Sequence, residues 1–72
     1  MNWKDKLHHK IINNWDIGEE FMLEDVYKFE EYFRKQYPNN KTVRASIRRN
    51  LQKIRDDGNI KFLGEGKYKR VK

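Results

Sequence analysis

Residues 41–58 read KTVRASIRRNLQKIRDDG, a basic segment in which apolar residues recur at helical spacing. The apolar positions, three or four residues apart, are Val43, Ile47, Leu51 and Ile54. This spacing gathers them on one side of a helix and leaves the basic residues on the other. We expect the helix to run from Thr42, which can cap its first turn, to about Asp57, because Gly58 is typical of a helix end.

A β-hairpin is predicted immediately after this helix. The segments Ile60–Leu63 and Tyr68–Val71 contain β-branched and aromatic residues, and the turn Gly64–Lys67 between them contains two glycines. Two such segments joined by a short glycine-containing turn are typical of paired antiparallel strands.

Two further helical patterns precede the basic segment. At the start of the chain a large apolar residue stands at every fourth position: Trp3, Leu7, Ile11 and Trp15. They predict a first helix over about Asn2–Asn14, followed by a short extended segment at Glu20–Leu23. A second helix is expected at about Glu24–Gln36, with Val26, Phe29, Phe33 and Tyr37 on its inward face. Met22 stands before it, where a capping Ser or Thr would be usual.

The order of these elements predicts a winged helix-turn-helix, an α+β fold that is mostly helical. It has three helices with a C-terminal β-hairpin as the wing, and we expect a single domain over residues 1–72. The chain has no cysteine, so the stability of its small core must come from packing, to which its 10 aromatic residues contribute. In this layout the third helix enters the major groove of DNA and the wing lies beside it.

The charge is unevenly distributed along the chain. Residues 1–40 have six Lys or Arg and eight Asp or Glu, a net charge of −2, whereas residues 41–72 have eleven and three, a net charge of +8. A strongly basic half beside a nearly neutral half is typical of a surface that binds a polyanion. We therefore expect double-stranded DNA as the partner.

The predicted third helix separates two kinds of contact. Its side opposite the apolar stripe presents Ala45, Arg48, Arg49 and Gln52, which we expect to read bases, since Arg can pair with guanine and Gln with adenine. Other basic residues are better placed for the DNA backbone, where contacts position the protein without reading sequence. They are Lys41, Arg44, Lys53, Arg55 and Lys61, together with Lys67, Lys69 and Arg70 on the wing.

The sequence predicts no catalytic residue, no metal site, no cofactor and no small-molecule substrate. Asp56 or Asp57 with Glu65-Gly66-Lys67 matches the Asp…Glu-x-Lys pattern of metal-dependent nucleases, but Glu65 lies in a glycine turn, so we interpret the match as coincidence. His8 and His9 are adjacent on a helix and point in different directions, which does not suit chelation. Without a signal peptide or an apolar run long enough to span a bilayer, we expect a cytoplasmic protein.

Five segments resemble one known family. They are FMLEDVY at residues 21–27, YPNN at 37–40, VRASIRRNLQ at 43–52, IRDDG at 54–58 and IKFLGEGKY at 60–68. Together they are similar to the C-terminal winged-helix domain of the Dam-replacing proteins, the Dpn-type methyl-directed restriction endonucleases, over about residues 15–70. The resemblance implies binding to duplex DNA at GATC-type sites whose adenine is methylated, with any cleavage in a separate nuclease domain.

The same resemblance implies that the reading residues lie within Asn40–Gln52 and the wing within Gly64–Lys69. It adds Thr42 to the base-reading residues and Asn40 to those that contact the backbone. A methyl group on adenine needs a small or apolar contact in the major groove, and Ala45 or the methyl group of Thr42 could supply it.

Other interpretations stay open at this stage. A small transcriptional regulator that binds an unmethylated operator as a dimer would need an apolar surface, which Trp3, Tyr27 and Tyr32 could provide. A winged helix that binds an acidic protein is a second alternative. RNA binding is less favoured, because it calls for exposed aromatic residues, and we expect Phe62 and Tyr68 to point inward. We expect a monomer or a weak dimer.

Overall fold

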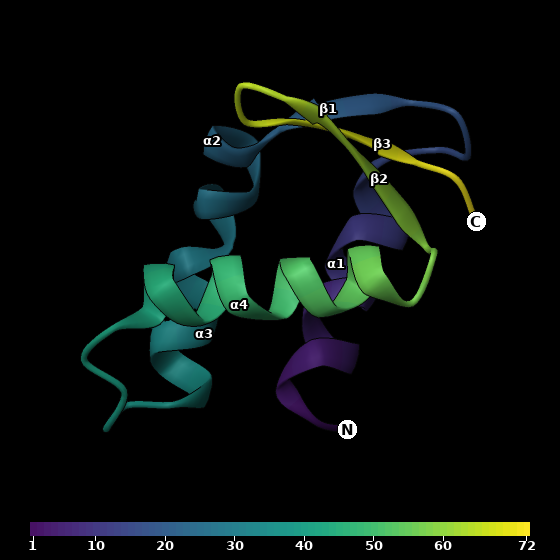
Figure 1. The fold of residues 1–72 in the computed structure, drawn as a ribbon. Coiled ribbons are helices and arrows are strands. Elements are labelled where there is room, and N and C mark those ends of the chain that lie inside the picture. The colour runs from purple at the N-terminus through teal and green to yellow at the C-terminus, as the bar shows by residue number, and fades with distance from the viewer.

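The computed structural model describes residues 1–72 and has the predicted winged-helix order (Figure 1). The elements are α1 (Trp3–Asn14), β1 (Glu20–Met22), α2 (Leu23–Val26), the 3₁₀ turn η1 (Tyr27–Phe29), α3 (Glu30–Gln36), α4 (Val43–Asp56), β2 (Ile60–Gly64) and β3 (Lys67–Arg70). The prediction of a mostly helical α+β fold with a C-terminal wing is confirmed. None of the helices combines the length and the apolar character that crossing a bilayer would require.

The three strands form one antiparallel sheet in the order β1-β3-β2 (Figure 1). Phe21 of β1 and Phe62 of β2 both pair with Tyr68 of the central strand, so this aromatic row shares one face of the sheet. Phe21 is buried in the core, which identifies the face that is turned toward the helices. Because side chains alternate along a strand, Lys67 and Lys69 project from the opposite face.

Ten buried apolar residues from α1, α2, α3, α4, β1 and β2 form the core. Trp3 and Trp15, the two tryptophans of the first helical pattern, are partly buried and pack against this core. Trp3 stacks on Phe33 with ring centroids 4.0 Å apart, and Trp15 stacks on Phe21 at 4.3 Å. Such aromatic pairs contribute about 0.5–1.5 kcal/mol each beyond the burial of their area, which matters in a core this small.

The second helix differs from the continuous helix predicted for Glu24–Gln36. It is divided into α2 and α3 by η1, and Phe29, at the junction, has φ −82° and ψ 0°. The first turn is tied to the sheet, because the N–H of Leu23 donates to the carbonyl of Gly66 at 2.8 Å. Met22 has no capping oxygen, but its N–H donates to the Asp25 carboxylate at 3.1 Å, which replaces part of the missing cap. This attachment sets α2 independently of α3, so the chain tightens into a 3₁₀ turn between them.

Candidate nucleic-acid interface

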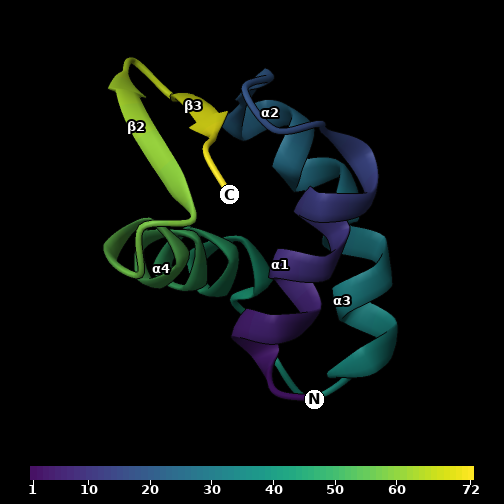
Figure 2. The ribbon, with the colours of Figure 1, turned by 90° about the vertical axis from the view of Figure 1, so that its right-hand side faces the viewer.

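The outward side of α4 is open along its length. Figure 2 shows this helix nearly end-on, with α1 and α3 on one side of it and no element covering the opposite side. Its buried residues are Val43, Ser46, Ile47, Asn50, Leu51 and Ile54, as the apolar spacing predicts. Arg48, Arg49 and Gln52 are exposed on the other side and Ala45 is half-buried between them. Asp56, an acidic residue that sequence reasoning did not include, lies on the same outward side one turn after Gln52.

Two arginines on one edge of this helix are held by residues of the preceding helices. The Arg48 guanidinium donates to the Tyr27 hydroxyl at 2.7 Å, and the Arg44 guanidinium lies over the Tyr27 ring at 4.8 Å. Nε of Arg44 also donates to Glu30 at 3.0 Å. We call Arg44 and Arg48 the buttressed flank of α4.

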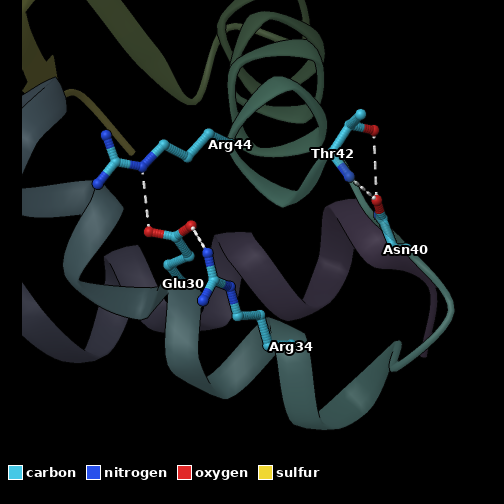
Figure 3. Close-up of polar contacts among 5 residues, drawn as sticks. All are labelled: Glu30, Arg34, Asn40, Thr42 and Arg44. Atoms are coloured by element: carbon cyan, nitrogen blue, oxygen red, sulfur yellow. Dashed lines mark hydrogen bonds and ion pairs between the residues drawn. The ribbon is translucent and has the colours of Figure 1, made fainter.

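Glu30 is the anionic centre of this support (Figure 3). Its carboxylate accepts from Arg44 through one oxygen and from Arg34 at 2.7 Å through the other, and its side chain is only 17% exposed. The hydrogen bond from Arg44, aided by the positive charge of Arg34, holds the pKa of Glu30 below its ordinary value. A carboxylate that is already paired on both oxygens repels DNA less than a free one would.

The opposite edge of α4 has no such support. The side chains of Arg49 and Lys53 are exposed and form no hydrogen bond or ion pair within the chain. We call these two residues the free flank. Gln52, on the crest between the two flanks, is likewise exposed without a partner.

The start of α4 corrects one prediction. Thr42 is at the cap position, but its side chain does not cap the helix. Instead the Asn40 side-chain oxygen accepts the Thr42 N–H at 2.8 Å and the Thr42 hydroxyl at 3.3 Å, as Figure 3 shows. Asn40 also donates to the Ser46 hydroxyl at 3.0 Å, so this asparagine, assigned to DNA contact, organises the loop before α4.

As a result, the first backbone N–H groups of α4 have no acceptor within the chain. They open onto a hollow of about 460 Å³. Arg34, Lys41 and Arg44 are among the residues that line it. Glu30, which is paired with Arg34 and Arg44, lines the hollow as well, so Lys41 is its cation without an acidic partner. A helix start with free N–H groups and this lysine suits a DNA phosphate.

The wing divides its basic residues between two faces. Lys61 pairs directly with Lys69 on the outer face, and Lys67 lies 3.7 Å from Glu20 of the neighbouring strand. Arg70, predicted to contact the DNA backbone, has a different position. Its guanidinium donates to the Trp15 carbonyl at 2.8 Å and to the Ile12 carbonyl at 3.5 Å.

The position of Arg70 follows from strand alternation. It lies two residues from Tyr68, so it shares the face that is turned toward the helices. There it supplies a cation to the C-terminus of α1, whose own last turn has no basic residue. Burial, together with the neighbouring charge of Arg70, lowers the pKa of His8 on α1. Arg70 therefore has a role in the fold that its prediction as a DNA contact did not include.

The aromatic residues of the wing also differ in part from the prediction. Tyr68 is half-buried, and burial is the main cause that raises its pKa, against the opposing charge of Arg55. Phe62 was expected to point inward and is 43% exposed. It is on the correct face of the sheet, but only Ile60 at the beginning of β2 reaches the core. Arg55 is half-buried beside the wing and pairs with Asp56 at 3.3 Å.

The acidic and histidine residues considered at the sequence level do not converge. No group of three or more His, Cys, Asp or Glu side chains lies close enough to hold a metal ion. Asp57 pairs with Lys4 at 2.7 Å, and Glu65 is in the turn of the wing with a φ of 50°.

One comparison with known proteins bears on this surface. The family model described as the Dam-replacing HTH domain matches residues 3–70, which is nearly the whole chain. A helix-turn-helix domain of this type binds double-stranded DNA and is non-catalytic on its own. The match, the winged-helix order and the basic open side of α4 agree, and this chain belongs to the family of Dam-replacing HTH domains.

Proposed function

We propose that residues 1–72 form one module that recognises GATC-type sites with N6-methylated adenine through the major groove. The observation that carries this proposal is the uncovered outward side of α4, where Arg48, Arg49 and Gln52 surround Ala45 in a member of this family. Arginine can make two hydrogen bonds to guanine, and glutamine can do the same with adenine. These are the purines of the proposed site.

The spacing around Ala45 suits a methyl group. Arg48 and Arg49 follow it by three and four residues, so both are its neighbours on the helix surface, and Thr42 stands at the cap position three residues before it. Methylation leaves adenine one N–H donor and adds an apolar group in the major groove. The small Ala45 side chain, with the Thr42 methyl beside it, provides an apolar contact between two cations.

Phosphate contacts would come from both sides of this reading surface. Lys41 and the free N–H groups at the start of α4 form one site, and Lys53 lies further along the helix. The wing supplies Lys61, Lys67 and Lys69. Arg44 and Arg55 are at the edge of α4 that faces the Tyr27 and Tyr68 aromatic residues.

The aromatic residues that could have formed a dimer surface are largely engaged within the chain. Trp3 stacks on Phe33 and Tyr37, and Tyr32 packs edge-on against Phe33 with the Lys10 ammonium over its ring at 4.0 Å. We therefore favour a monomer or weak dimer over a regulator that dimerises through these rings. Cleavage of the bound DNA would belong to a separate nuclease domain.

The test is a fluorescence-anisotropy titration of the purified chain. Matched duplexes contain GATC unmethylated, methylated on one strand and methylated on both, and a fourth contains methylated adenine in a scrambled sequence. We expect the tightest binding to the doubly methylated GATC duplex, with the preference persisting at higher salt, because base contacts depend less on counterion release than phosphate contacts do. Equal affinity for all four duplexes would reject methylated-site recognition and leave a DNA-binding winged helix of another specificity.

A further inference from the structure

Tyr27 contacts both arginines of the buttressed flank, although the sequence suggested for it only a place in an apolar dimer surface. Its hydroxyl oxygen accepts from Arg48 at 2.7 Å, and its ring lies under the Arg44 guanidinium at 4.8 Å. No other side chain of the chain makes a hydrogen bond, ion pair or cation–π contact with two of the predicted DNA contacts. Tyr27 is half-buried and packs against the core, so it is anchored on its other side.

Tyr27 lies at the junction where α2 ends and η1 begins. Tyr27 is the first residue of η1, where the chain turns by about 120° per residue instead of the 100° of an α-helix. In the continuous helix expected from the sequence, the inward stripe passed through Val26 and Phe29, and Tyr27 lay beside it. In the structure the Tyr27 side chain reaches across to α4, and the neighbouring Val26 is fully buried.

The contacts have a consequence for Arg48. An arginine side chain on an exposed helix surface samples many rotamers, and fixing one of them on binding costs entropy. A hydrogen bond from a charged donor to an anchored hydroxyl restricts that sampling before DNA arrives. Arg49 lies on the free flank, on the other side of the outward face from Arg48. It has no such partner.

We propose that Tyr27 is a positioning residue for specificity: it holds Arg48 ready for a base contact and thereby sets how strongly this domain discriminates between DNA sequences. This inference rests on the proposed base-reading role of Arg48. Tyr27 acts through the arginine and needs no contact of its own with a base.

The test uses Tyr27→Phe, which removes the hydroxyl and keeps the ring under Arg44. The matched control is Tyr32→Phe, because the Tyr32 hydroxyl forms no hydrogen bond within the chain. Binding is measured on the doubly methylated GATC duplex and on a scrambled duplex. Tyr27→Phe should lose about three- to tenfold on the preferred duplex, the range that the net contribution of one typical hydrogen bond converts to, and much less on the scrambled one. Tyr32→Phe should bind both as the parent chain does.

A second measurement needs no DNA. Relaxation of the arginine Nε–Hε groups by NMR should show Arg48 more ordered than Arg49 in the free chain, and Tyr27→Phe should remove that difference. In the Arg48→Ala background, Tyr27→Phe should have no further effect on binding. Unchanged Arg48 order, or the same loss with and without Arg48, would overturn the inference.

The two proposals can fail separately. If the parent chain ignores methylated GATC, the proposed function fails, and the NMR comparison still decides whether Tyr27 holds Arg48. If the parent chain prefers methylated GATC while Tyr27→Phe discriminates equally well, the role of Tyr27 fails and the proposed function stands.

Discussion

The two flanks of α4 have similar residues in different physical situations. Arg48 on the buttressed flank is hydrogen-bonded to Tyr27, and Arg44 is paired with Glu30. Arg49 and Lys53 on the free flank have no partner and are exposed. Arg48 can therefore meet a base edge already ordered, whereas Arg49, the other proposed base-reading arginine, has to be ordered when DNA binds. A mobile Lys53 can satisfy a phosphate from many positions. The comparison teaches that residues of the same charge on one helix differ in how ordered they are before DNA binds, because the support behind each side chain differs.

The largest expected effect concerns the buttressed flank. Arg48→Ala should cost about 1–3 kcal/mol on the preferred duplex and reduce base preference at one position. The reason is that a directional contact, already ordered before binding, is lost. Anisotropy titrations on duplexes with single base-pair changes measure this, and an equal loss on every sequence would show that Arg48 contacts only phosphate.

Arg70 tests whether an arginine that stabilises the fold can be distinguished from the arginines that bind DNA. Arg70→Ala should lower the free energy of unfolding by about 1–2 kcal/mol, since the carbonyls at the end of α1 lose a charged donor. Chemical denaturation measures the effect. DNA affinity of the folded variant should change less than about twofold, and a large, salt-dependent loss of affinity would show that Arg70 also contacts DNA.

Lys53→Ala tests the free flank. The variant should bind all duplexes more weakly by a similar factor, and the slope of log affinity against log salt should decrease by about one phosphate contact. Lys69→Ala on the wing should behave in the same way. Titrations at several salt concentrations provide the slopes. A change in sequence preference in either variant would mean that the replaced lysine takes part in base reading and does not only contact phosphate.

The smallest expected effect concerns the pH dependence of the ion pairs between Glu30 and its two arginine partners. The pKa of Glu30 is lowered by its arginine partners, so the charged form stabilises the folded state. That stabilisation is present above the unfolded-state pKa of a glutamate and is lost as the pH falls through the lower folded-state pKa. Glu30→Gln should therefore flatten the decline in Tm between about pH 6 and about pH 3. Glu31→Gln, which removes an exposed carboxylate without an ion pair, is the control and should leave the decline unchanged.

Local patterns were sufficient for α1, α4 and the hairpin. The apolar residues of α4 are spaced for one helical face, and the structure buries all four of them. The same periodicity predicted which side of α4 faces outward, because a regular helix has one geometry whatever surrounds it. Capping was less predictable. Thr42 is at the cap position, yet its N–H and its hydroxyl both donate to the Asn40 side-chain oxygen, and its side chain does not cap the helix.

Contacts between distant residues decided the rest. The hydrogen bond between Leu23 and Gly66 joins residues 43 positions apart and ties α2 to the sheet, so the second helix breaks at η1. Arg70 meets the end of α1 and Tyr27 meets Arg48 only after the chain has folded. Periodicity describes one element at a time, whereas these pairings depend on how elements pack against one another. The outward face of α4 could therefore be predicted from the sequence, but which of its arginines are held in place could not.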